Sequence, residues 1–147
     1  MTISMERKKI LIVEDDLVLL ETLTEILTYD GYQCRGCDSP GTVTAVAESF
    51  RPDLFIIDYM LPDWNGGELC GAIRGMDGFE QTPIIITSAY TKILLSLADY
   101  GCDAILEKPF NIDELLNLVG SLLRSGTTDS GLLPRIKMIV KNVIPRI

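Results

Sequence analysis

The sequence predicts an α/β protein built on a doubly wound, five-stranded parallel sheet, with one further helix in the tail. Short apolar runs alternate along the chain with segments in which apolar residues recur every three or four positions, as expected for strands that alternate with helices. The strand-like runs are apolar without alternation, which indicates that both faces of the sheet are covered. Right-handed crossovers between parallel strands then place helices on both faces.

The first half of the chain accounts for three strands and two helices. In chain order they are expected at residues 9–13 (strand), 17–29 (helix), 32–37 (strand), 42–50 (helix) and 54–57 (strand). Asp16 is the predicted N-cap of the first helix, because a carboxylate there accepts hydrogen bonds from free amide groups of the first turn. Asp30 and Gly31 are expected to end that helix.

The second half repeats the pattern and then changes character. Further elements are expected at residues 67–74 (helix), 83–87 (strand), 91–100 (helix), 103–106 (strand) and 112–123 (helix). Residues 125–132 are polar and contain glycine, which is typical of a linker. A tail helix is predicted over residues 136–144, where apolar residues follow helical spacing between Pro134 and Pro145. We therefore divide the chain into a domain at residues 8–124 and a linker with a tail helix at residues 125–147.

Charge is distributed unevenly along the 147 residues. Residues 1–124 contain 9 basic and 20 acidic side chains, a net charge of −11, whereas residues 125–147 contain 4 basic and 1 acidic, a net charge of +3, which gives the total of −8. An acidic body does not attract nucleic acid, because neutralising phosphates takes clustered lysine and arginine. No apolar run is long enough to span a bilayer and no signal peptide is recognisable, so we expect a cytoplasmic protein without membrane contact.

The lack of histidine and the placement of two cysteines exclude several kinds of catalytic and metal site. The chain contains no histidine, which excludes a Ser–His–Asp triad, histidine metal ligation and a phosphohistidine within these residues. Cys34 and Cys37 form a Cys-x-x-Cys pair inside a strand-like stretch, and neither a second pair nor a histidine completes a zinc site. We interpret both thiols as packing residues.

Polar side chains gather where the predicted strands end. Glu14 and Asp15 follow the first strand, Asp58 follows the third, Ser88 comes just after the fourth, and Lys108 comes soon after the fifth. In an open parallel sheet the carboxyl ends of the strands form the rim where ligands bind. Taken singly, each residue reads as a loop residue or a helix cap, whereas the joint placement at four strand ends predicts a functional site.

The chemistry of this set is that of phosphoryl transfer to a carboxylate. Clustered carboxylates without histidine or cysteine ligands favour a hard cation, and Mg²⁺ suits one or two carboxylates together with water and phosphate oxygens. A carboxylate that attacks phosphorus forms an aspartyl phosphate, while a cation and a lysine neutralise charge on the transferring group.

Five motifs occur in a specific order along the chain. They are residues 10–16 (ILIVEDD), 52–62 (PDLFIIDYMLP), 63–66 (DWNG), 83–89 (PIIITSA) and 107–110 (EKPF). Together they resemble the receiver domain of two-component response regulators, the CheY-like superfamily, and the resemblance covers residues 8–124. It implies a flavodoxin-like sheet of strand order 2-1-3-4-5. It also implies a cytoplasmic phosphoprotein that acts as a signalling switch and turns over no separate substrate.

The resemblance implies a role for each site residue. Asp58 is the phosphoacceptor in the phosphorelay. Mg²⁺ is bound directly by Asp15 and Asp58, through water by Glu14, and by the backbone carbonyl of Met60. The hydroxyl of Ser88 binds a phosphoryl oxygen. Lys108 pairs with Asp58 or its phosphate, and the peptide bond before Pro109 is expected to be cis.

One position departs from the family pattern. Many receivers carry tyrosine or phenylalanine in the fifth strand, three residues before the lysine, and this chain has Ile105 there. The phosphorylation chemistry is therefore expected to be complete, whereas the usual aromatic readout is missing. The partner implied by the resemblance is a sensor histidine kinase or a phosphotransfer protein.

Two surfaces are candidates for protein contacts. The predicted helix 91–100 carries four apolar side chains that cannot all face the sheet, namely Ile93, Leu94, Leu95 and Leu97. This helix with strand 5 and helix 5, or alternatively the tail helix, is a candidate homodimer surface. The tail equally suits a linker or the start of an output region. The sequence does not identify the cognate kinase or the effector.

Two other functions compete with the switch. A phosphatase or phosphotransferase of the haloacid dehalogenase type places Asp-x-Asp after its first strand, whereas this chain has Glu14, Asp15 and Asp16 there and its candidate nucleophile after the third. A flavin-binding module lacks support, because no phosphate loop rich in serine, threonine or glycine follows the first strand.

Overall fold

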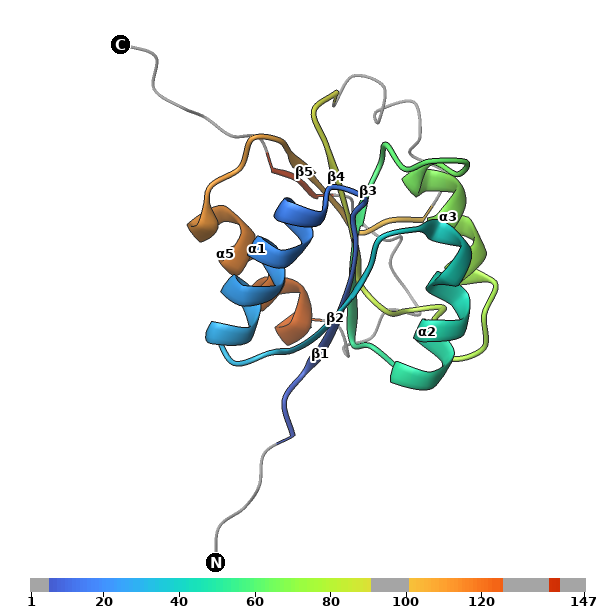
Figure 1. The fold of residues 1–147 in the computed structure, drawn as a ribbon. Coiled ribbons are helices and arrows are strands. Elements are labelled where there is room, and N and C mark those ends of the chain that lie inside the picture. Colours follow the sequence, from blue (N-terminus) through green and yellow to red (C-terminus); the bar gives the residue numbers. More distant parts are fainter. Residues whose placement is uncertain (1–5, 91–100, 126–137, 141–147) are drawn as a thin grey trace, which may run out of the picture.

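A computed structural model describes residues 6–90, 101–125 and 138–140, and shows a single sheet between two layers of helices (Figure 1). The elements are β1 (Lys9–Val13), α1 (Leu17–Tyr29), β2 (Gln33–Cys37), the short 3-10 helix η1 (Pro40–Thr42), α2 (Val43–Phe50), β3 (Leu54–Asp58), α3 (Gly66–Arg74), β4 (Ile84–Ser88), β5 (Ala104–Glu107), α5 (Ile112–Ser125) and β6 (Met138–Val140).

The sheet is parallel throughout, and its strand order is β2-β1-β3-β4-β5-β6. Helices α1 and α5 cover one face and α2 and α3 cover the other (Figure 1). The first five strands therefore have the predicted order 2-1-3-4-5 and the predicted doubly wound arrangement. The order reverses between β1 and β3, which is where an open sheet of this kind places its functional groups.

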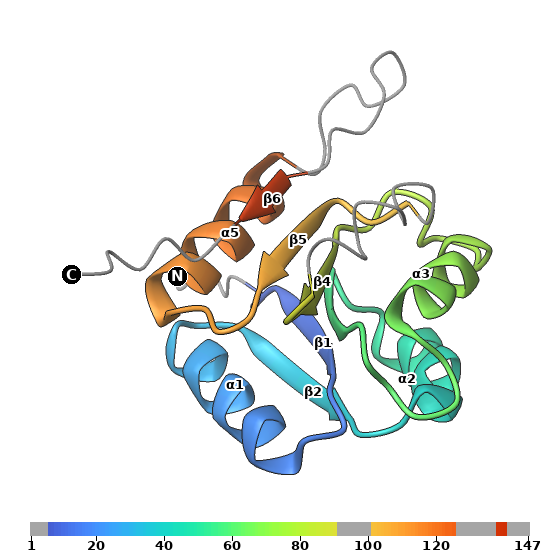
Figure 2. The same cartoon turned by 90° about the horizontal axis from the view of Figure 1, so that it is seen from above.

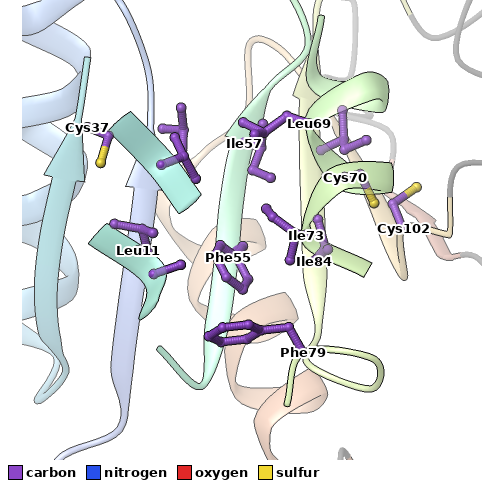
Figure 3. Packing of buried hydrophobic residues seen from close by; sticks show 14 of the residues in the cluster. Leu11, Cys37, Phe55, Ile57, Leu69, Cys70, Ile73, Phe79, Ile84 and Cys102 are labelled. Carbon is purple, nitrogen blue, oxygen red and sulfur yellow. The ribbon is translucent and has the colours of Figure 1, made fainter. Parts of the chain in front are cut away.

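Side chains of β1, β3 and β4 alternate between two apolar cores. Leu11, Phe55 and Ile84 point into the core under α2 and α3, where the rings of Phe55 and Phe79 pack edge to face at a centroid distance of 5.4 Å (Figure 3). Ile10 and Leu54 point into the core under α1 and α5. Burial on both faces explains why these strands are apolar without alternation.

Helices α3 and α5 begin in the same way. Asn65 precedes α3, and its side-chain oxygen accepts the N–H of Glu68 at 2.9 Å while its amide group donates to the Glu68 carboxylate at 2.8 Å. Asn111 and Glu114 repeat both contacts at α5. Such reciprocal bonds satisfy first-turn amide groups that the helix itself leaves free. They fix where each helix starts and hence how it leaves the rim of the sheet.

The tail differs from the prediction at residues 138–140. A helix was expected over 136–144, but Met138–Val140 form the strand β6, which pairs with β5 in the register Ala104↔Met138 to Leu106↔Val140 (Figure 2). The outer edge of β5 offers unpaired backbone groups, and an apolar segment with β-branched residues satisfies them as well as it forms a helix. The spacing of apolar residues in the sequence gives no indication of this strand pairing.

Two other expectations lie outside the described residues. The helix predicted at 91–100, with its apolar residues Ile93, Leu94, Leu95 and Leu97, is one. The linker predicted at 125–132 is the other, except that Ser125 belongs to α5, which extends past its expected end at residue 123. The homodimer surfaces that use these segments stay predictions. No helix in the described ranges is both long enough and apolar enough to cross a membrane.

The Cys-x-x-Cys pair lies on β2 with its thiols on opposite faces. Cys37 packs in the core under α2 and α3, and Cys34 packs against the core under α1 and α5. Burial raises the pKa of both thiols. These two residues therefore share no metal site, which agrees with their interpretation as packing residues.

Candidate functional site

Three parallel strands bring the predicted site residues to one rim of the sheet. Glu14 directly follows β1, Asp58 is the last residue of β3, and Lys108 directly follows β5. The register pairs Val13 with Ile57, so the ends of β1 and β3 lie level. The expected strand 3 ended at residue 57. The structure extends β3 by one residue, which makes Asp58 part of the ordered sheet.

Lys108 joins two buried carboxylates. Its Nζ lies 3.1 Å from Oε2 of Glu14 and 3.1 Å from Oδ1 of Asp58. Glu14 is 3 % exposed and Asp58 is 6 % exposed. Two carboxylates removed from water repel each other, and a cation between them offsets that repulsion. The contact with Asp58 was expected, whereas the contact with Glu14, 94 residues away in the chain, had no signal in the sequence.

Burial and neighbouring charges shift the pKa values of both Glu14 and Lys108. Burial raises the pKa of the Glu14 carboxyl, and the charge of Asp58 raises it further, against the lowering effects of the Asp16 N–H and Lys108. Burial acts to lower the pKa of the Lys108 ammonium, but the charges and hydrogen bonds of Asp58 and Glu14 outweigh it, so the net pKa is raised. Lys108 is therefore a firmly held cation, and the pocket favours positive charge.

Asp15 adds a third carboxylate beside the buried pair. One oxygen each from Glu14, Asp15 and Asp58 lie within 4.8 Å of one another, and Asp15 is exposed. The set contains only carboxylate oxygens, which match the preference of a hard divalent cation. Because Asp15 is exposed while Glu14 and Asp58 are buried, water can reach this side of the pocket. The pocket therefore suits an ion that keeps part of its water shell.

Asp16 belongs to the framework of the site. Its Oδ1 accepts the N–H groups of Val18 and Leu19 at 3.1 and 3.2 Å, which confirms the predicted N-cap of α1. Its own N–H donates to Oε1 of Glu14 at 3.2 Å. The same turn thus starts α1 and orients the Glu14 carboxylate.

Two hydroxyl residues end β4 beside the carboxylates. Thr87 is paired with Asp58 in the strand register, and Ser88 is paired with Glu107. Both hydroxyl residues are buried, and the Ser88 Oγ accepts the N–H of Tyr90 at 2.9 Å. That bond uses an acceptor site of the hydroxyl and leaves its hydrogen to donate. The assignment of Ser88 to a phosphoryl oxygen stays a prediction.

The loop between β3 and α3 carries Met60, whose side chain is exposed. The loop folds back on itself, since the carbonyl of Tyr59 accepts the N–H of Leu61 at 3.2 Å and the N–H of Gly66 at 2.8 Å. The N–H of Tyr59 donates to the Thr87 carbonyl at 2.9 Å. Met60 thus lies in a short closed loop directly after Asp58, and the role of its carbonyl as a ligand stays a prediction.

Strand β5, which leads directly to Lys108, is buried at Ile105. Ile105 is 2 % exposed and packs in the core under α2 and α3. The peptide bond between Lys108 and Pro109 is cis, as the sequence predicted, and the Lys108 N–H donates to the Ser88 carbonyl at 2.8 Å. An aliphatic residue so enclosed offers no ring to expose or withdraw at the surface.

The comparisons with known proteins agree with this geometry. The family model for the response regulator receiver domain matches residues 10–120. The chain belongs to this family, whose members are the phosphoacceptor domains of two-component response regulators.

Three known proteins illustrate the relationship. The DNA-binding response regulator MtrA of Mycolicibacterium paratuberculosis is 38% identical over 122 residues, which cover 80% of this chain and 52% of MtrA. A putative response regulator from Chloroflexus aurantiacus has a TM-score of 0.76 at 27% identity, covering 81% of this chain and 99% of that one. Response regulator TrrA of Thermotoga maritima, in complex with Mg²⁺ and BeF, has a TM-score of 0.72 at 31% identity, covering 78% of this chain and 98% of that one. The chain spans about half the length of the curated relatives it matches.

Proposed function

We propose that Asp58 accepts a phosphoryl group and that residues 8–124 form the receiver unit of a signalling switch. One observation carries the proposal: the buried Asp58 carboxylate ends β3 and lies 3.1 Å from Lys108, within a pocket shared with Glu14 and Asp15. A carboxylate that only solvates a loop has no need of burial or of a cationic partner at hydrogen-bond distance.

We propose that Mg²⁺ binds to Asp15, Asp58 and the Met60 carbonyl, with Glu14 acting through water. The all-oxygen donor set and the close approach of three carboxylates, whose mutual repulsion a cation relieves, both favour a divalent cation in this pocket. Bound there, Mg²⁺ supplies positive charge to the oxygens of the transferring phosphoryl group.

Three side chains of this chain have separate roles in the proposed phosphoryl transfer. A carboxylate oxygen of Asp58 attacks phosphorus in line with the leaving nitrogen of a phosphohistidine, so that an O–P bond forms while the N–P bond breaks and its electron pair stays on the imidazole. Lys108 balances charge on the phosphoryl oxygens, and the Ser88 hydroxyl donates to one of them. The donor lies outside these 147 residues, because they contain no histidine.

The surface around the pocket suits a protein donor. Six exposed large apolar side chains lie near the carboxyl edge of the sheet, at the ends of strands, the starts of helices or the loops between them: Leu17, Val18, Met60, Trp64, Tyr90 and Ile112. Exposed apolar side chains that gather on one edge of a molecule are a feature of protein contact surfaces. We propose that a sensor histidine kinase or a phosphotransfer protein docks on this rim.

The partners that read the switch and its location in the cell are also proposals. The body is acidic, so we propose that this chain does not itself bind nucleic acid, although MtrA is a DNA-binding regulator. We propose a surface that includes β5 and α5 as the homodimer or effector contact, and residues 125–147 are the alternative. Cys34 and Cys37 are free thiols, which suits a reducing, cytoplasmic location.

Phosphorylation by a small donor tests the central proposal. Acetyl phosphate with Mg²⁺ is expected to add one phosphoryl group to the wild type and none to Asp58→Asn, as measured by intact-mass spectrometry. Asp30→Asn, at the exposed end of α1, is the matched control and should be modified normally. Equal modification of wild type and Asp58→Asn contradicts the proposal, and steady hydrolysis of a small phosphate ester contradicts the expectation that no separate substrate is turned over.

A further inference from the structure

Gly66, the first residue of α3, lies directly against the backbone of Asp58. A Cβ built at Gly66 would be 2.7 Å from the carbonyl oxygen of Asp58 and 2.9 Å from the Cα of Tyr59. The first distance is 0.7 Å shorter than the 3.4 Å at which ordinary contact begins. Both neighbours are backbone atoms at the end of a buried strand, so they cannot turn aside as a side chain can.

The glycine is needed for space rather than for backbone conformation. Its φ is not among the positive values that the structure shows at Gly31, Gly78 and Gly101. Its N–H donates to the Tyr59 carbonyl at 2.8 Å, which joins the start of α3 to the residue after Asp58. Close approach and this hydrogen bond occur together, because the bond requires α3 to begin in contact with the β3 backbone.

This contact holds both ends of the loop that contains Met60. On one side the Tyr59 N–H is bound to the Thr87 carbonyl on β4, and on the other the Tyr59 carbonyl is bound to Gly66 on α3. The Asn65 side chain fixes the start of α3 through the N–H of Glu68. The position of the backbone at Asp58 and Met60 therefore depends on how closely α3 approaches the end of β3.

We propose that Gly66 is a positioning residue for cation binding at the Asp58 pocket. This inference rests on the proposed function, since it concerns the same Mg²⁺ site. A divalent cation of this size requires ligand oxygens placed near ideal octahedral positions at about 2.0–2.1 Å. A displacement of several tenths of an ångström in the Asp58 and Met60 backbone exceeds what such a site tolerates.

The test compares two glycines of the same helix. Gly71 also lies in α3, and a Cβ there would meet no atom within 4 Å, so Gly71→Ala introduces the same chemical change without the clash. Mg²⁺ affinity is measured by NMR titration of the amide signals of residues 14–16 and 58–61, at a temperature where each variant is folded. Gly66→Ala is expected to bind Mg²⁺ at least tenfold more weakly than wild type, and Gly71→Ala is expected to bind it equally well.

Two further variants separate positioning from folding. Ile73→Val, in the buried face of α3, lowers stability without approaching the pocket and should keep wild-type affinity. Asn65→Ala removes the side chain that fixes the start of α3 and should weaken Mg²⁺ binding by a smaller factor, even if Gly66→Ala does not fold. Wild-type affinity in Gly66→Ala, or in Asn65→Ala if the former is unfolded, overturns the inference. A wild type that binds no Mg²⁺ instead overturns the proposed function.

Discussion

Arg74 at the end of α3 forms an ion pair of 2.9 Å with Asp103, the residue before β5. The guanidinium group also donates to the carbonyls of Gly101, Phe79 and Thr82. Oδ2 of Asp103 also accepts the N–H of Ile84 at 2.8 Å, and the Asp103 N–H donates to the Ile84 carbonyl at 2.9 Å. One side chain thus ties the end of α3 to the segments that lead into β4 and β5.

Replacing Arg74 by methionine is expected to lower the free energy of unfolding by about 3 kcal/mol, because it leaves a largely buried carboxylate and several carbonyls without their donor. Urea unfolding monitored by circular dichroism measures the change. Arg124→Met, at the exposed end of α5, should alter stability by less than about 0.5 kcal/mol. A loss for Arg74→Met no larger than that of Arg124→Met would show that the network is not stabilising.

Replacing Lys108 by methionine leaves Glu14 and Asp58 buried without their shared cation. The expected loss is about 3 kcal/mol in the absence of Mg²⁺. Saturating Mg²⁺ should restore part of that loss, because the ion replaces the missing positive charge and stabilises the state that binds it. Urea unfolding with and without Mg²⁺ gives both values. The prediction fails if Mg²⁺ stabilises the variant no more than it stabilises wild type or the exposed-lysine control Lys8→Met.

Mg²⁺ binding is expected to weaken on acidification at a pH above that of an ordinary glutamate. The pKa of the Glu14 carboxyl is raised from 4.5 by burial first and by Asp58 second, so the pocket keeps a proton when a free glutamate has already lost it. A raised carboxyl pKa also means that ionising Glu14 opposes folding, so its contribution to stability falls as pH rises from 4.5 through the folded pKa.

Trp64 fluorescence provides the measurement for this pH dependence. Trp64 is 40 % exposed and lies in the loop after Asp58, so Mg²⁺ should change its emission. Titrations at several pH values should show affinity falling towards acid pH in wild type and a flatter dependence in Glu14→Gln. Identical pH profiles for the two proteins would exclude Glu14 as the group responsible.

Ser88 and Thr87 compete for the role of the hydroxyl that binds the phosphoryl group. The family resemblance selects Ser88, whereas the strand register places Thr87 beside Asp58. We expect Ser88→Ala to slow phosphorylation by acetyl phosphate by about 10²-fold, the cost of removing one donor from a transferring oxyanion. Thr87→Val should have a smaller effect. Rates from intact-mass time courses decide, and the reverse order of effects would transfer the role to Thr87.

The framework of the site could be predicted because it depends on local patterns. Uninterrupted apolar runs located the strands, and the rule that parallel strands present functional groups at their carboxyl ends brought Glu14, Asp58 and Lys108 together. The cap Asp16 was predicted from its residue type and its place before an apolar stripe. Each of these inferences needs only neighbouring residues and one general property of sheets.

The remaining features depend on contacts between distant parts of the chain. The bond between Lys108 and Glu14, the network of Arg74 and the close approach of Gly66 arise from how elements pack, and a lysine, an arginine and a glycine occur in many other roles. The pairing of residues 138–140 was missed for the same reason. Helical spacing was present there, but a free strand edge offered a competing set of hydrogen bonds.

The same pairing determines what the sheet presents to other chains. Without β6, the outermost strand on that side would be β5, an apolar strand whose open backbone groups could recruit an extended segment of another molecule. Within the part of the chain that the structure describes, the outermost strand is then β6, whose three residues form a short edge, and short edge strands template sheet growth poorly. At the opposite edge, β2 exposes Gln33 and the charged Arg35. Both margins of the sheet therefore discourage aggregation through strand addition.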